Sequence, residues 1–185
     1  MGYYDLDDIL ADSSKFACRF NYELPGLGYL EGNPGKPVGK HSKVELPLWL
    51  ASVLATVTGE QEHVDEEALP FVEFLPPEMF SARVVNAIKA DAPTLDVHSI
   101  NGHFYALGTR WAALFSDAGL AGMLAGMVLE RALEVQRHAA SAAVEATAPT
   151  DATARMLQTL DEWERQLYRR AHAASRDAKL WAARR

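Results

Sequence analysis

The side chains able to do chemistry are scattered along this chain and match no known catalytic spacing. Six histidines share no metal-ligand spacing, and the nearest pair, His98 and His103, lies on either side of a turn. Gly26-Leu27-Gly28 begins like a dinucleotide-binding loop, but Glu31 stands where that loop requires its third glycine. No P-loop, GxSxG or HExxH motif occurs. The sequence therefore predicts no cofactor, no metal site and no enzymatic activity.

The carboxylates come in three runs, near Asp5, over 60–67 and over 161–164. Catalytic carboxylates normally meet other polar groups in a cleft, whereas each of these runs is typical of a solvent-exposed face. On the last run, the spacing of Asp161 and Glu162 from Arg165 predicts pairing on the solvent side of a helix. A small-molecule enzyme stays the less favoured alternative, because it needs a pocket of converging titratable groups.

Composition predicts an ordinary intracellular protein with one core and room for a small second domain. The chain has 185 residues, of which 49% are hydrophobic and 23% charged. Its single cysteine, Cys18, indicates a reducing compartment. The first residues lack the order of a signal peptide, and the apolar run over 118–129 is shorter than the about 20 residues of a membrane span. We expect a soluble protein with no membrane partner.

The net charge of −7 is spread unevenly. Residues 1–67 hold 12 acids and 5 bases, whereas residues 155–185 hold 4 acids and 8 bases. The acidic N-terminal part argues against general binding of nucleic acid, which needs clustered lysine and arginine. The basic end leaves one alternative open, a free-standing helical adaptor that binds DNA between Arg165 and Arg185. The simpler interpretation is a solvated helix face.

The first 45 residues predict a small β-rich domain. Phe16, Cys18 and Phe20 alternate with more polar neighbours, which is the period of a half-buried strand, so Cys18 is expected in the core. The following segment, 25–40, is rich in glycine and proline and predicts tight turns. Residues 43–46 predict a closing strand. Two or three short strands need a neighbour to pack against.

From residue 46 onward the pattern is helical, and the sequence predicts a helical domain over 46–185. Helices are expected from Pro47 through 57, from Pro77, over 103–115, from 118 through the alanine-rich segment, and from Thr150 or Asp151. An acidic linker is expected over 59–70 and a turn-rich connection over 91–102. The predicted fold class is mainly α, an α-helical bundle domain preceded by a small β-rich N-terminal domain.

The expected helix over 44–57 is apolar on nearly every side. One explanation is a central position in a bundle, where such a helix is ordinary. The favoured explanation is a subunit interface, because helices with apolar stripes on more than one side usually meet more than one neighbour.

Five sequence blocks, which lie between residue 1 and about Arg170, resemble those of a known protein family. They are MGYYDLDDILAD, PGLGYLEGNPG, KVELPLWLA, VHSINGHFYALG and LDEWERQLYRR, in this order. In this order and at these distances, they resemble the family of the third subunit of the eukaryotic GINS complex, in its fungal form.

The resemblance implies a non-catalytic subunit with its β domain first. GINS is a heterotetramer that joins the MCM ring and its Cdc partner in the CMG replicative helicase, where the ring hydrolyses ATP. The implied partners are therefore the three other GINS subunits, the MCM ring and its Cdc partner, with the replicative polymerase as a further partner. Contact with DNA would be indirect or weak, and the implied location is the nucleus.

Combining the resemblance with the surplus apolar surface, we expect aromatic and aliphatic anchors at the interfaces with sister subunits. The predicted interface residues are Leu48, Trp49, Val53, Trp111, Leu160, Trp163, Leu167 and Tyr168.

Overall fold

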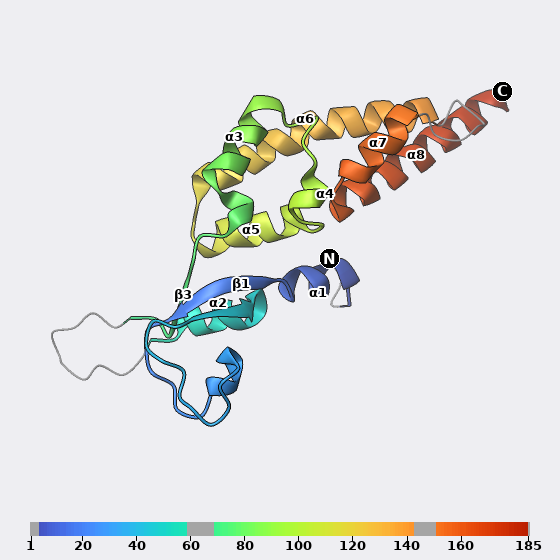
Figure 1. Ribbon diagram of the computed structural model, residues 1–185. Helices are drawn as coiled ribbons and strands as arrows, with labels where there is room; N and C mark the ends of the chain where they lie inside the picture. The colour runs from blue at the N-terminus through green and yellow to red at the C-terminus, as the bar shows by residue number, and fades with distance from the viewer. Residues whose placement is uncertain (1–3, 59–68, 143–150, 185) are drawn as a thin grey trace. The chain divides into compact units, whose positions relative to one another are not determined.

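The computed structural model describes residues 4–58, 69–142 and 151–184 (Figure 1). The chain divides into two compact units, Met1–Glu78 and Met79–Arg185. The first carries a small sheet and the second is built from helices. The predicted fold class, mainly α with a small β-rich N-terminal domain, is confirmed.

The sheet of the first unit has the antiparallel order β2-β1-β3. Its strands are β1 (Lys15–Phe20), β2 (Lys43–Pro47) and β3 (Val72–Phe74). Cys18 lies opposite Val44 on one side and opposite Phe74 on the other. Phe16, Cys18 and Phe20 are all buried, so the predicted alternation is confirmed. The sequence did not predict β3.

Two helices flank the strands, α1 (Leu6–Asp12) and α2 (Leu48–Thr56). The α2 helix starts directly after β2, and the amide of Leu48 donates a hydrogen bond of 2.9 Å to the carbonyl of Ser14. Leu48 and Ala51 are buried among the sheet residues. The sequence predicted α2 but not α1, which is only seven residues long and begins at an Asp5 cap.

The division between the units comes later than residue 45, where the sequence places it. The α2 helix packs on all three strands, and β3 pairs with β1 although about 50 residues separate them. These contacts keep the chain up to Glu78 in the first unit. Of the expected acidic linker over 59–70, residues 59–68 lie outside the described residues. Pro70 forms an antiparallel bridge with Thr58.

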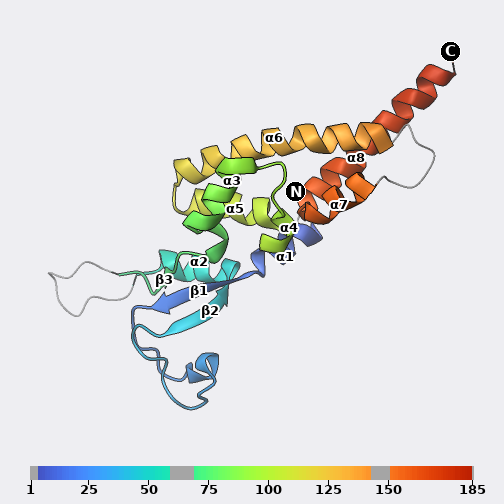
Figure 2. The ribbon, with the colours of Figure 1, turned by 45° about the horizontal axis from the view of Figure 1, so that its top comes forward.

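The second unit begins inside a short 3-10 helix, Glu78–Phe80, whose last two residues belong to it. Its helices are α3 (Ala82–Asp91), α4 (Val97–Ile100), α5 (Phe104–Leu114), α6 (Ala118–Ala142), α7 (Asp151–Thr159) and α8 (Glu162–Ala183). The α6 and α8 helices run side by side (Figure 1, Figure 2).

Three expectations about these helices are corrected. The α3 helix begins at Ala82 and not at Pro77, because the 3-10 turn comes first. A short helix, α4, interrupts the connection over 91–102. The expected single last helix is two helices, because the chain leaves helical geometry at Leu160 and Asp161.

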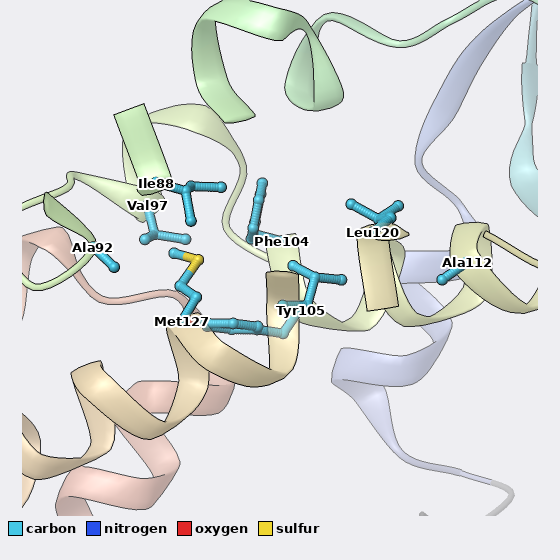
Figure 3. Packing of buried hydrophobic residues seen from close by; sticks show 9 residues of the cluster. Ile88, Ala92, Val97, Phe104, Tyr105, Ala112, Leu120 and Met127 are labelled. Atoms are coloured by element: carbon cyan, nitrogen blue, oxygen red, sulfur yellow. The ribbon is translucent and has the colours of Figure 1, made fainter. Parts of the chain in front are cut away.

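A cluster of buried residues joins α3, α4, α5 and α6 (Figure 3). Its buried members are Ile88, Ala92, Val97, Phe104, Tyr105, Ala112, Leu120, Leu124 and Met127. The rings of Phe104 and Phe80 meet edge to face, with centroids 5.9 Å apart. At Gly108, a Cβ would lie 2.8 Å from Leu124 Cδ1, so this glycine lets α5 and α6 approach closely.

The loop between β1 and β2 depends on Gly28. Its amide donates to the carbonyl of Lys36 at 2.9 Å, and its carbonyl accepts from the amide of Asn33 at 2.8 Å. A Cβ at this position would collide with the backbone carbonyls of both partners, which cannot rotate away as a side chain can.

We expect Gly28→Ala to destabilise this loop by about 1–3 kcal/mol, the usual cost of overpacking. Faster hydrogen exchange at the amides of Leu24 and Val38, which bond to each other's carbonyls, would report the effect. Gly39→Ala is the matched control, because a Cβ there meets no atom of the described residues within 4 Å. Equal exchange in the two variants would contradict the prediction.

Candidate functional site

The interior of the second unit contains a buried ion pair between Arg131 of α6 and Glu164 of α8. The two residues are 2% and 1% exposed. Arg131 Nε donates to Glu164 Oε1 at 2.6 Å and Nη2 donates to Oε2 at 2.9 Å. This two-pronged geometry is the strongest arrangement available to an arginine and a carboxylate. It fixes α6 against α8 at one point along their length.

The remaining nitrogen of Arg131 binds the backbone between α3 and α4. Nη1 donates to the carbonyls of Ala92 and Leu95, each at 2.8 Å, and to that of Pro93 at 3.2 Å. Carbonyls that follow the end of a helix need donors when they are buried. One guanidinium therefore holds a loop, its own helix and α8 together.

Asp161 and Glu164 also cap the beginning of α8. Asp161 Oδ1 accepts from the amide of Glu164 at 2.8 Å, and Glu164 Oε2 accepts from the amide of Asp161 at 3.3 Å. This reciprocal pair is a capping box. The other oxygen of Asp161 accepts from the amide of Tyr105 at 3.2 Å, and the Tyr105 hydroxyl donates to Glu164 Oε1 at 2.9 Å. The first turn of α5 is thereby joined to the first turn of α8.

Burial changes the acid–base properties of this network. Burial raises the pKa of Tyr105 above its usual range, and the nearby Glu164 carboxylate adds to the effect. Burial alone would lower the pKa of Arg131, but its bonds to Glu164 outweigh burial and the pKa is raised. Burial raises the pKa of Asp161 to about 6, although the amides of Glu164 and Tyr105 act to lower it. Asp161 is thus the residue of this network whose charge changes at mildly acidic pH.

The arrangement is suited to holding helices together and not to reacting with a substrate. Asp161 and Glu164 are enclosed by protein, and the polar atoms of the network bind one another or the backbone. Among the described residues, no group of three or more His, Cys, Asp or Glu side chains is placed to hold a metal ion. No helix within that part of the chain is long and apolar enough to span a membrane.

Sequence reasoning misjudged these carboxylates. Asp161 and Glu164 were expected on a solvent-exposed face, but both are buried, because Arg131 and Tyr105 approach them from other helices. Only Glu162 behaves as expected, pairing with Arg165 at 3.6 Å. The Asp-x-x-Glu spacing at 161–164 is a capping-box signal that could have indicated a helix start. No local signal identified Arg131.

The predicted interface residues occupy three kinds of environment. Trp49, Val53 and Trp163 are exposed, with Trp49 at 55% and Val53 at 57%. Partly buried positions are held by Trp111, Leu167 and Tyr168. Leu48 and Leu160 are enclosed by the chain's own fold and offer a partner no surface. The structure therefore leaves six of the eight residues for a partner to contact.

Two family models match this chain. The PSF3 N-terminal domain matches residues 4–56, and the helical bundle domain of GINS complex proteins matches residues 79–183. The second match covers the whole Arg131–Glu164 network. A curated relative from Kluyveromyces lactis, named DNA replication complex GINS protein PSF3, is 53% identical over 98% of each chain. This chain belongs to the PSF3 family of GINS proteins.

Other relatives with the same name agree. The Saccharomyces cerevisiae protein is 48% identical over 98% of each chain. The Candida albicans protein is 39% identical over 97% of this chain and 96% of its own. The resemblance read from the sequence blocks is therefore confirmed. The start of the second family match at Met79 coincides with the start of the second structural unit.

We expect Arg131→Met to destabilise the second unit by about 3–5 kcal/mol, because it leaves the Glu164 carboxylate buried without its cation. Arg137→Met is the matched control on the same helix. Arg137 is exposed and pairs with Glu134 at 3.3 Å, so its loss should cost at most about 1 kcal/mol. Urea unfolding followed by circular dichroism measures both. Similar losses in the two variants would show that the buried pair has no special role.

The raised pKa of Asp161 predicts a pH dependence of stability. The pKa is about 6 in the folded chain and about 4 in an unfolded one, so the folded state binds the proton more tightly. The stabilisation from this proton is complete below about pH 4 and is lost as the pH rises through about 6.

Asp161→Asn removes this titration. We expect the unfolding free energy of the variant relative to the unsubstituted chain to rise by about 3 kcal/mol between about pH 4 and pH 7. Urea unfolding at stepped pH measures the difference. A difference that stays constant with pH would contradict the prediction.

Proposed function

We propose that this chain is a non-catalytic subunit of a heterotetrameric GINS complex, built together with three other GINS subunits. Family membership supports the proposal, because relatives that match it over 97% or more of this chain are named as DNA replication complex GINS proteins. The helical unit matches a domain described for GINS complex proteins in general.

The observation that carries the proposal is the apolar surface left on α2. One side of this helix packs on the sheet through Leu48 and Ala51. The other side exposes Trp49 and Val53, four residues apart along the helix, and the exposed Val57 follows directly after the helix ends. Large apolar side chains exposed together on and beside one helix are typical of a contact with another protein. We propose that Trp49 and Val53 are anchors for a sister subunit, with Trp163, Leu167 and Tyr168 as contacts on the second unit.

A scaffolding role in the replicative helicase extends this proposal. In it, the complex joins the MCM ring and its Cdc partner in the nucleus, the ring performs the ATP hydrolysis, and this chain contributes surface and rigidity. The Arg131–Glu164 network supports such a role, because the buried charges of Arg131, Asp161 and Glu164 fix helices to one another. Contact with DNA is not required of α8, where Arg165 and Arg169 pair with Glu162 and Arg176 pairs with Asp177.

Co-expression with the three sister subunits tests the proposal. Light scattering after size exclusion should give the mass of a complex with one copy of each chain. A chain that stays monomeric and elutes separately from the sisters would contradict it.

The proposed anchors on α2 lead to a further prediction. Trp49→Glu with Val53→Glu should weaken incorporation into the complex at least about 30-fold, since buried tryptophan anchors commonly contribute about 2 kcal/mol or more. Lys43→Glu, an exposed charge reversal in the same unit, is the control and should assemble normally. Quantitative pull-down with tagged sister subunits measures both. Unchanged incorporation of the double variant would exclude α2 from the interface.

A further inference from the structure

The joint between the first turns of α5 and α8 encloses more negative than positive charge. Asp161, Glu164 and Arg131 are 0%, 1% and 2% exposed. When all three are ionised, two carboxylates share one guanidinium, so one negative charge lies in excess away from water. A buried charge without a counterion is costly, and a carboxyl group avoids the cost by binding a proton. The joint is therefore a place where the folded chain takes up one proton.

Asp161 is the carboxyl group that takes the proton. The groups that face it are Tyr105 from α5, Arg131 from α6 and Glu164 of α8 itself. Glu164 binds the guanidinium of Arg131 through both oxygens, and protonation there would break a charged bond. The oxygens of Asp161 accept from two backbone amides instead, and burial together with the charge of Glu164 raises its pKa to about 6.

The two oxygens of Asp161 differ in what protonation costs. Oδ1 accepts from the amide of Glu164 at 2.8 Å, whereas Oδ2 accepts from the amide of Tyr105 at 3.2 Å. A protonated carboxyl oxygen is a donor, and it no longer accepts from an N–H that points at it. The longer bond is the weaker one, so the proton goes to Oδ2. The amide of Tyr105 then loses its acceptor, while the cap of α8 stays bound.

Tyr105 connects this buried bond to the surface. It lies in the first turn of α5, and its ring packs edge to face against the ring of Trp163, with centroids 5.5 Å apart. Trp163 lies in the first turn of α8 and is 44% exposed. A displacement of Tyr105 from α8 therefore changes the surroundings of a tryptophan that meets solvent.

We propose that the joint between α5 and α8 is a proton-operated switch that sets the position of Trp163. With Asp161 ionised, the amide of Tyr105 is bound and the Tyr105 ring holds Trp163. With Asp161 protonated, the two first turns separate and Trp163 takes a second position at the surface. The inference concerns this chain by itself and does not depend on its assembly with other subunits.

The switch is a local change and not an unfolding step. Protonation removes the excess negative charge, which stabilises the folded chain, and it breaks one hydrogen bond in the joint. The bonds of Arg131 to Glu164 and to the backbone after α3 do not involve this proton. They keep the helices of the unit together in both states.

Fluorine NMR of the full chain labelled with 5-fluorotryptophan tests the inference. The sequence contains four tryptophans, and the loss of one signal in Trp163→Phe assigns the signal of Trp163. We expect this signal to shift between about pH 7.5 and about pH 5, with a midpoint near the Asp161 pKa of about 6. Trp49 in the first unit and Trp181 near the end of α8 serve as references that should not follow this curve.

Asp161→Asn mimics the protonated acid, because its amide has nearly the same shape and offers one acceptor and one donor group. The Trp163 signal of this variant should stay at its acid position throughout the pH range. His103→Gln is the matched control. His103 directly precedes α5, and histidine is the other side chain that commonly titrates near this pH. The control should keep the titration of the unsubstituted chain.

Three results would overturn the inference. The first is a Trp163 signal that does not change with pH. The second is a titration that persists in Asp161→Asn or disappears in His103→Gln, since another group would then be responsible. The third is a loss of helical circular dichroism with the same midpoint, because the change would then be general unfolding.

Discussion

The second unit depends on the charge pair between Arg131 and Glu164. A buried charge without its partner is costly, so the helices that carry the two residues have one arrangement in which both charges are satisfied. The same guanidinium binds the loop after α3, and the same carboxylate binds Tyr105 of α5. Apolar packing alone tolerates sliding of one helix along another, whereas these directional bonds do not.

The buried polar groups and the exposed apolar groups of this chain have different roles. The buried polar groups around Arg131 and Glu164 are satisfied within the second unit, through the capping box of α8 and the bonds of Arg131. Apolar groups that point outward, such as Trp49 on α2 and Leu129 on α6, are more than half exposed. A rigid interior with apolar outer faces is what a permanent subunit of a larger assembly requires.

Local patterns in the sequence predicted the elements with strong periodicity. The alternation around Cys18 indicated β1, Pro47 indicated the start of α2, and the spacing of 103–115 indicated α5, because each signal lies within a few residues of its consequence. The strand β3 and the helices α1 and α4 are too short for periodicity to reveal. The buried role of Glu164 depends on Arg131, 33 residues away, and no local pattern contains that information. For the same reason, the sequence could not separate buried Leu160 from exposed Trp163, and it predicted both as interface residues.

The most direct test of this account is an experimental structure of the chain together with its three proposed sister subunits. We predict that Trp49 and Val53 become largely buried against another subunit while the bonds between Arg131 and Glu164 stay as they are in the chain alone. A complex in which these two side chains remain exposed would contradict the central claim, that the apolar surface of α2 is covered by a partner subunit.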